Sequence, residues 1–154
     1  MGYLLAAFLL FLAESLLKRY ILRHREALPR PILGGRVLLR FYPNRGFAFS
    51  CLGNRPKLVR WVVSLTVVAF LWVTLPALLA AAPPVPPLAG VGLALVYAGA
   101  FSNLLDRWRL GYVVDYFSFP RARRRTLASL VFNLADLCIF SGGLLYVIVF
   151  FCRS

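Results

Sequence analysis

The chain has 154 residues, of which 61% are hydrophobic, and its mean hydropathy is +0.78. That length suits one domain, and the composition is too apolar for an ordinary soluble protein. The formal net charge is +13, from 18 Lys and Arg residues against five acidic ones. The basic residues border apolar stretches without any nucleic-acid recognition motif. The composition therefore argues against a nucleic-acid-binding protein and favours a membrane protein whose basic rim faces anionic lipid headgroups.

Four apolar stretches are long enough to cross about 30 Å of hydrocarbon as helices, at about 1.5 Å per residue. In chain order they cover residues 3–22, 61–80, 88–105 and 127–152. The sequence therefore predicts an all-α membrane protein in which residues 1–154 form a single integral membrane domain. The first stretch lacks a preceding basic region and a clear cleavage site, so we interpret it as a permanent helix.

A surface β element is expected between the first two helices, at about residues 34–52. Residues 36–42 are mostly aliphatic and aromatic and follow a Pro- and Gly-containing segment, which predicts a strand. Asn44-Arg45-Gly46 predicts a turn, and Phe47-Ala48-Phe49 resumes an extended apolar stretch. We therefore expect a small β-hairpin on the membrane surface.

The second and third helices are expected to be neighbours because residues 81–87 form a short, uncharged, proline-rich connection. The third helix is rich in small residues, which let helix backbones approach closely in lipid. They are Gly90, Gly92, Ala94, Ala98, Gly99, Ala100 and Ser102. We interpret them as a packing signal.

Carboxylates in apolar segments are costly, so each is a functional hypothesis by default. The acidic residues are Glu14, Glu26, Asp106, Asp115 and Asp136. Glu14 and Lys18 are four residues apart in the first helix, which predicts a structural ion pair. Asp106 is followed by Arg107, and an ion pair at the helix end is the favoured interpretation of that dipeptide.

Asp136 is the acid most strongly predicted to be functional. Asn133 lies three residues before it, on the same face of the predicted fourth helix, and Asn103 and Asp106 repeat that spacing in the third. A satisfied interhelical hydrogen bond is the alternative for Asp136. Asp115 lies in the connecting loop, where aspartate is common, so spacing alone leaves its role open. Both aspartates are expected toward the same membrane face.

Two neighbouring carboxylates share a proton, so one can act as a base and the other as an acid. Such a pair can activate a water for attack on a peptide carbonyl while it protonates the leaving amine. Asn103 and Asn133 are candidates to orient the carboxylates or a substrate carbonyl. No cofactor or metal is expected: Cys51, Cys138 and Cys152 lack metal-ligand spacing and are interpreted as free thiols. GxSxG, HExxH and P-loop motifs are absent from the sequence.

Four segments in order resemble signal peptidase II, the bacterial membrane aspartyl peptidase that processes prolipoproteins. The resemblance spans nearly the whole chain. The segments are Asn44-Arg45-Gly46-Phe47-Ala48-Phe49, Asn103-Leu104-Leu105-Asp106-Arg107, Gly111-Tyr112-Val113-Val114-Asp115-Tyr116 and Phe132-Asn133-Leu134-Ala135-Asp136.

The resemblance implies an enzyme that cuts the signal peptide from diacylglyceryl-modified prolipoproteins, immediately before the lipidated cysteine. It implies that Asp115 and Asp136 are the catalytic pair. The supporting and substrate-contacting positions it implies are Asn44, Gly46, Asn103, Asp106, Arg107, Asn133, Ala135, Glu14 and Lys18. We also expect contact with anionic phospholipids, no nucleic-acid partner and a monomer.

Four positions depart from the family pattern. Glu14 stands where aspartate is usual, and Phe47 stands where a smaller residue is usual. Ser102 replaces a glycine, and Leu137 replaces a serine. These changes bear on substrate fit near the turn and on packing around Asp136, and they leave both aspartates in place.

Charge and resemblance disagree on membrane orientation. All but one of the basic residues lie in residues 18–60 and 107–125, on the face expected to carry both aspartates. The positive-inside rule would make that face cytoplasmic. The resemblance implies an active site at the extracytoplasmic face of the cytoplasmic (inner) membrane, which we adopt because the substrates are exported.

Two other functions remain open from the residues. A small four-helix transporter would use Glu14 as a protonatable group beside a water-filled path and would not need Asp115. A catalytically inactive relative would keep the fold and bind lipid or a membrane protein through its basic face.

Overall fold

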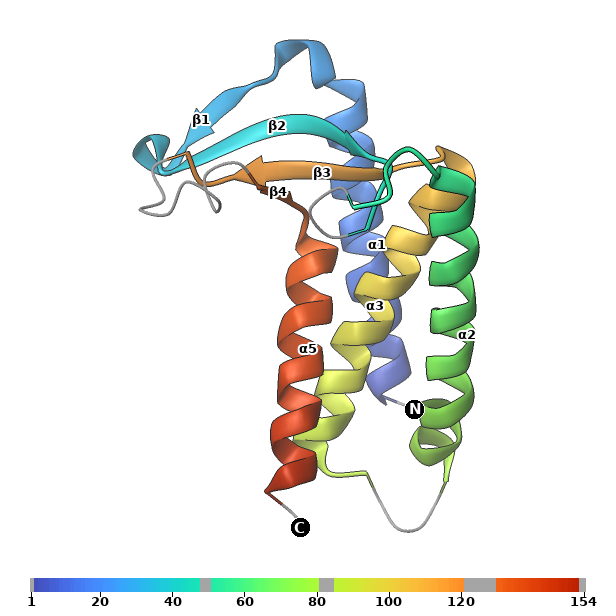
Figure 1. Cartoon of the computed structure of the whole chain (residues 1–154). Coiled ribbons are helices and arrows are strands. Elements are labelled where there is room, and N and C mark those ends of the chain that lie inside the picture. The colour runs from blue at the N-terminus through green and yellow to red at the C-terminus, as the bar shows by residue number, and fades with distance from the viewer. Residues whose placement is uncertain (1, 48–50, 81–84, 121–129, 153–154) are drawn as a thin grey trace.

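A computed structural model describes residues 2–47, 51–80, 85–120 and 130–152. Within these ranges the chain forms four α-helices that run side by side and a four-stranded sheet that lies across one end of them (Figure 1). Both termini lie at the end of the helices away from the sheet (Figure 1). The structure thus has a helical body and a sheet end.

The helices are α1 (Gly2–Arg23), α2 (Pro56–Leu79), α3 (Pro87–Arg109) and α5 (Leu134–Phe151). Proline opens α2 and α3, at the first helical position where its missing N–H costs no intrahelical hydrogen bond. By length and composition α2 and α3 are able to cross a membrane, and residues Leu134–Val149 form a shorter apolar helix. The four predicted membrane crossings therefore remain a prediction.

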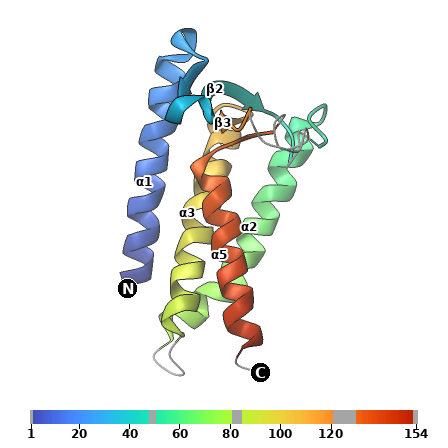
Figure 2. The same cartoon turned by 90° about the vertical axis from the view of Figure 1, so that its left-hand side faces the viewer.

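The central helix is α3, with α1 on one side and α2 on the other (Figure 2). A Cβ added at Gly92 would lie 2.8 Å from the Gly142 carbonyl oxygen, and one added at Gly142 would lie 2.5 Å from the Gly92 carbonyl oxygen. The backbones of α3 and α5 therefore touch, which confirms that the glycines of α3 serve close packing. Predicted contact between α2 and α3 is also confirmed, by a 2.8 Å hydrogen bond between the Thr74 and Tyr97 hydroxyls.

The sheet is antiparallel, with strand order β1-β2-β3-β4. Its strands are β1 (Arg30–Ile32), β2 (Val37–Asn44), β3 (Val113–Ser118) and β4 (Val131–Phe132). Short 3₁₀ turns at Arg25–Ala27 and Leu33–Gly35 flank β1. The predicted strand at 36–42 is confirmed as β2.

Three predictions about this region need correction. The strands paired with β2 are β1 and β3, whereas residues 48–49 of the expected hairpin lie outside the described ranges. Residues 113–118 form a buried strand where a loop was expected, because their β-branched and aromatic side chains suit a sheet covered on both faces. The last helix begins at Leu134 and not at residue 127, since residues 131–132 pair with β3.

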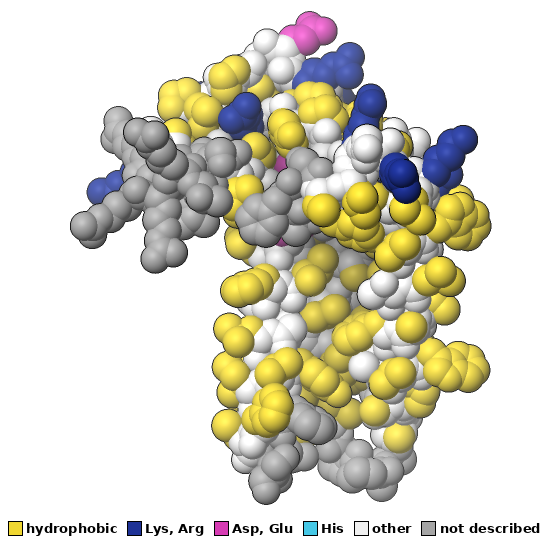
Figure 3. Space-filling model, in the orientation of Figure 1, with side chains coloured by type: hydrophobic (Ala, Val, Ile, Leu, Met, Phe, Trp, Pro, Cys, Tyr) yellow, Lys and Arg dark blue, Asp and Glu magenta, His cyan; other side chains and the backbone are white. Residues whose placement is uncertain are grey.

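The surface separates into two zones. Large apolar side chains cover the helical body, and Lys and Arg side chains gather at the sheet end (Figure 3). Trp72, Val73 and Phe140 are 82%, 74% and 74% exposed, which in water would be unfavourable for such large side chains. The helical body therefore presents a lipid-compatible surface below a basic rim.

Candidate active site

The two predicted aspartates lie where the sheet meets the helices. Asp115 is in the middle of β3, which pairs with β2, and Asp136 is in the first turn of α5. Asp115 is 1% exposed, whereas Asp136 is partly exposed. Asp115 thus comes from a strand and Asp136 from a helix, and one asparagine, Asn133, hydrogen-bonds to both carboxylates.

Asn133 bridges the two carboxylates. Its side-chain amide donates to Asp115 Oδ1 at 2.7 Å, and its backbone N–H donates to Asp136 Oδ2 at 3.2 Å. In return, the Asp136 N–H donates to Asn133 Oδ1 at 2.8 Å. This reciprocal pair is a capping box, so Asn133 precedes the helix and does not share a helical face with Asp136 as predicted. The three-residue spacing from Asn133 to Asp136 is that between the N-cap and the third residue of α5.

Asn103 of α3 continues the network. Its amide donates to Asp136 Oδ1 at 2.8 Å, and its carbonyl oxygen accepts from Asn133 Nδ2 at 3.2 Å. The same oxygen accepts from Lys18 Nζ at 2.8 Å. The two asparagines therefore hold both oxygens of Asp136 in a defined orientation.

A turn after β2 closes over Asp115. Asn44 donates to Asp115 Oδ2 at 3.0 Å and accepts from the Gly46 N–H at 3.0 Å. Arg107 donates to the Gly46 carbonyl at 2.9 Å and to the Asn103 carbonyl at 3.1 Å. Its Nε is buried without a partner among the described residues. The predicted supporting residues Asn44, Gly46 and Arg107 thus form one edge of the site.

A buried lysine connects α1 to α3. Lys18, 2% exposed, contacts Asp106 Oδ2 at 2.8 Å and Glu14 Oε1 at 3.7 Å, and donates to the Ser102 hydroxyl at 3.0 Å. The predicted Glu14–Lys18 ion pair is confirmed. The favoured Asp106–Arg107 pair is wrong among the described residues: Asp106 instead binds Lys18 and accepts from the Val114 N–H at 3.1 Å. Successive residues of a helix point apart, which separates Asp106 from Arg107.

Glu14 meets the start of α5. Its carboxylate accepts from the Ala135 N–H at 3.3 Å and from the Tyr116 hydroxyl at 2.8 Å. The Tyr116 hydroxyl also accepts from the Leu134 N–H at 2.9 Å. Tyr116 had no predicted role because residues 113–118 were expected to form a loop; in β3, side-chain alternation places it on the opposite face from Asp115.

The charge state of Asp115 is set by its surroundings. Burial, together with the nearby charge of Asp136, raises the pKa of Asp115 to about 7, although hydrogen bonds from Asn44 and Asn133 oppose the shift. Asp115 is therefore poised to hold or release a proton near neutral pH. Burial, and then the Glu14 carboxylate, raise the pKa of the Tyr116 hydroxyl, which keeps it protonated as a donor.

Across the described ranges no three His, Cys, Asp or Glu side chains are grouped as metal binding would require. Cys51, Cys138 and Cys152 are free thiols, as predicted.

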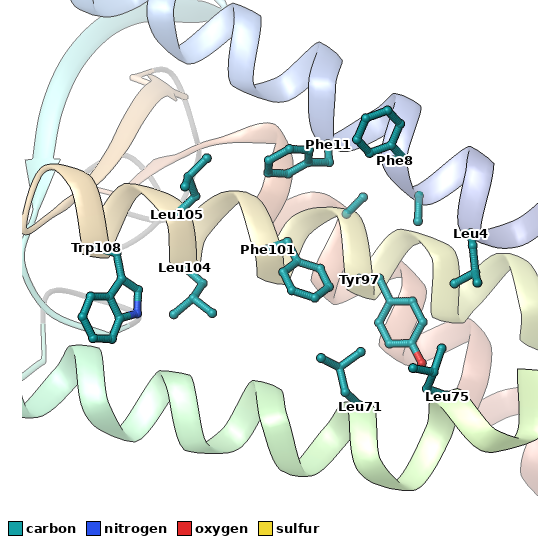
Figure 4. Close-up of a pocket in the computed structure, with 12 residues that line it drawn as sticks. Leu4, Phe8, Phe11, Leu71, Leu75, Tyr97, Phe101, Leu104, Leu105 and Trp108 are labelled. Atoms are coloured by element: carbon teal, nitrogen blue, oxygen red, sulfur yellow. The ribbon is translucent and has the colours of Figure 1, made fainter.

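A separate apolar pocket of about 640 Å³ lies between α1, α2 and α3 (Figure 4). Trp108 lies at its end nearest the sheet, and Leu4 lies toward the opposite end (Figure 4). The guanidinium of Arg60 stacks 4.6 Å from the centre of the Trp108 ring. The pocket contains none of the predicted site residues, so it offers apolar contact and no acid–base chemistry.

Residues 6–152 match the family model described as signal peptidase (SPase) II. The chain belongs to the signal peptidase II family. It is 36% identical to the lipoprotein signal peptidase of Moorella thermoacetica, over 92% of this chain and 87% of that protein. It is 32% identical to that of Clostridioides difficile, over 100% of this chain and 99% of that protein. The family consists of aspartic peptidases, and this chain is an enzyme of that type.

Solved structures agree on the fold. A chain described as a bacterial membrane enzyme, determined at 2.3 Å resolution, has a TM-score of 0.77 over 97% of this chain and 87% of that one, at 19% identity. A second, at 1.9 Å resolution, has a TM-score of 0.75 over 97% of this chain and 92% of that one, also at 19% identity. The architecture of helices and sheet is therefore that of known membrane enzymes.

The structure locates the four departures from the family pattern. Ser102 adds a hydroxyl ligand to Lys18 that a glycine would lack, and Glu14 reaches the N-terminus of α5. Phe47 is partly buried and its N–H donates to the Cys51 carbonyl at 2.8 Å. Leu137 is 46% exposed beside Asp136. Two departures thus join the buried network, and Leu137 adds apolar surface next to it.

Proposed function

We propose that this chain cleaves the signal peptide from diacylglyceryl-modified prolipoproteins, immediately before the lipidated cysteine, and that Asp115 and Asp136 activate the attacking water. Processing of lipoprotein signal peptides is the activity of its family. The observation that carries the proposal is the bridge through Asn133, which binds both carboxylates at once. Glu14, by contrast, accepts from the Ala135 N–H at the start of α5 and pairs with Lys18.

In the proposed reaction the two carboxylates share one proton. The ionised aspartate takes a proton from water, which attacks the peptide carbonyl, and the protonated aspartate gives its proton to the leaving amine. Partial exposure of Asp136 supports entry of water and substrate from its side, because Asp115 is almost fully enclosed. The pKa of Asp115 near 7 favours a singly protonated pair at neutral pH.

The remaining predicted residues are proposed to hold the pair or contact substrate. Asn103 and Asn133 orient Asp136, and Asn44 orients Asp115. Lys18 and Asp106 neutralise each other behind Asn103. Arg107 is partly exposed and is proposed to contact an extended peptide, whereas Gly46 and Ala135 are buried and are proposed to support the site through their backbone hydrogen bonds.

We also propose that the four helices all cross the cytoplasmic membrane and that the sheet faces the extracytoplasmic side. Helices of 22 and 18 residues, α1 and α5, span about 33 and 27 Å at 1.5 Å per residue, close to the thickness of the hydrocarbon core. The arginines at the sheet end would then bind anionic phospholipid headgroups of the outer leaflet. Reporter fusions at both termini test this orientation, since both are expected in the cytoplasm.

Asp115→Asn and Asp136→Asn test the dyad. Each variant keeps size and shape but cannot exchange the proton, so we expect hydrolysis of a diacylglyceryl-modified precursor to fall at least about a thousandfold. Glu26→Gln is the matched control, because Glu26 is exposed in the Arg25–Ala27 turn and lies outside the network. The assay compares purified variants in detergent, with folding checked by circular dichroism.

Full activity in either aspartate variant would disprove the mechanism. A water-filled path beside Glu14, together with a dispensable Asp115, would instead favour the transporter hypothesis. That outcome is not expected, because Glu14 is 3% exposed and its carboxylate already binds Tyr116 and Ala135. A well-folded wild-type chain that never cleaves lipidated precursors would indicate an inactive relative.

A further inference from the structure

We propose that the Tyr116 hydroxyl is a positioning group for the reaction: it holds the first turn of α5, and with it Asp136, against the strand that carries Asp115. The proposal rests on the proposed dyad and adds a residue to it. Tyr116 itself touches neither carboxylate of the pair in the hydrogen bonds of the described residues; its contacts are with Glu14 and Leu134.

The first observation is that consecutive residues of β3 reach the start of the same helix. Side chains alternate along a strand, so Asp115 and Tyr116 point to opposite faces of the sheet. Asp115 binds Asn133 on one side, and Tyr116 binds the Leu134 N–H on the other, at 2.7 and 2.9 Å. The start of α5 therefore hydrogen-bonds to side chains on both faces of β3.

The second observation is that the first three N–H groups of α5 each have a different acceptor. The N–H groups of a first helical turn lack intrahelical partners and need acceptors when buried. Leu134 donates to the Tyr116 hydroxyl, Ala135 to Glu14 and Asp136 to Asn133. Tyr116 also donates to Glu14, so two of the three acceptors act as one unit. Loss of that hydroxyl leaves one N–H without a partner and weakens the hold on the next.

The third observation is that Tyr116 is 2% exposed and its ring belongs to an apolar cluster with Ile21 and Val114. Packing alone would be served by phenylalanine. The hydroxyl is the part that connects α1, β3 and α5, and a buried hydroxyl is unfavourable unless it is fully hydrogen-bonded. Its two short hydrogen bonds meet that requirement.

Tyr116→Phe tests the proposal because it removes the hydroxyl and keeps the ring. We expect kcat for a synthetic peptide carrying a diacylglyceryl-modified cysteine to fall about tenfold or more, with KM changed less than about twofold, because substrate contacts remain while the helix turn that carries Asp136 loses one of its hydrogen bonds. Hydrogen exchange of the Leu134 and Ala135 amides should become faster. The full chain is used in detergent micelles.

Tyr112→Phe is the matched control. Tyr112 packs against the same apolar cluster and against Phe41, and its hydroxyl has no hydrogen bond within the described part of the chain. The same loss of an oxygen there should leave kcat and amide exchange unchanged. An equal fall in both variants would mean that the effect is general packing, and would overturn the proposal.

A double-mutant cycle with Glu14→Gln sharpens the result. If Tyr116 acts through Glu14, the double variant should lose little more kcat than the worse single variant; multiplicative losses would overturn the shared unit. Wild-type kcat in Tyr116→Phe overturns the proposal while leaving the dyad intact, provided that Asp115→Asn and Asp136→Asn are inactive. Activity in those two variants would disprove the dyad itself.

Discussion

The helices α3 and α5 meet in two different ways along their length. At the sheet end, Asn103 of α3 binds Asp136 of α5 through a side-chain amide. Further into the helical body, Gly92 and Gly142 bring the two backbones into contact. The first contact orients polar groups, whereas the second sets how closely the helices approach. Changes at the glycines should therefore impair folding first, and changes to the two aspartates should impair chemistry first.

Replacement of the buried lysine has the largest expected effect on stability. Lys18→Met leaves the carboxylates of Asp106 and Glu14 buried without their cation, which should cost about 3–5 kcal/mol. Thermal unfolding in detergent measures the loss, with the exposed Arg19→Met as control. Equal stability of the two variants would contradict a structural role for the lysine in the polar region.

Asp115 should contribute to the pH dependence of stability. Its pKa is about 7 in the folded protein, against 3.8 for an unperturbed aspartate, so the folded state binds the extra proton between those values. Stability should therefore decrease as pH rises from about 4 to about 7, by about 1.4 kcal/mol per unit of pKa difference. Activity that needs a singly protonated pair should decrease above about pH 7.

Unfolding transitions measured from pH 4 to 8 check this sign. Asp115→Asn cannot titrate, so its stability should depend on pH much less than that of the wild type. An unchanged pH slope in that variant would assign the titration to another group and weaken the link between burial of Asp115 and its chemistry.

A single methyl group at the glycine contact should have a smaller effect. Gly142→Ala places a Cβ within 2.5 Å of the Gly92 carbonyl oxygen, which should cost about 1–3 kcal/mol as the helices separate. The adjacent Gly143→Ala meets nothing within 4 Å and should be neutral or slightly stabilising. The fraction of folded protein after detergent extraction distinguishes them, and the same loss in both would show that helix spacing is not the cause.

The smallest expected effect is at Ser102. Ser102→Ala removes one of the hydrogen bonds of Lys18 and should cost about 0.5–1.5 kcal/mol, with kcat little changed because Asp106 and Asn103 still hold the lysine. Thermal unfolding and the cleavage assay measure the two quantities. A large loss of activity would mean that Ser102 also supports catalysis through Lys18.

Hydropathy predicted the helical segments but could not tell α2 from α3. Both are long and apolar, yet only three of the 24 residues of α2 are buried, against ten of the 23 in α3. Burial depends on which helix lies between the others. The small residues of α3 indicated close packing, but not that α5 is the partner in contact with Gly92 and Gly99.

Two features near the site were not predicted from the sequence, because both depend on pairing between strands. The sequence of β3 resembled a loop between two helices, and its extended form depends on hydrogen bonds to β2 and β4, which come from distant segments. Asn133 and Asp136 were predicted on one helical face, although their spacing equally suits a capping box. The pairing of β4 with β3 ends the strand at Phe132 and leaves Asn133 to start the helix.

The sequence by itself determined the apolar segments, the basic rim and the identity of the polar residues, because side-chain chemistry and spacing are local properties. Family membership followed from four motifs in order. Only the tertiary structure decided that Asp106 pairs with Lys18 and not Arg107, and that Tyr116 and Glu14 hold the start of α5. Lys18 and Ser102 are 84 positions apart in the chain, and Glu14 and Tyr116 are 102 apart. Such contacts form only when the helices and the sheet pack together, so no local pattern could specify them.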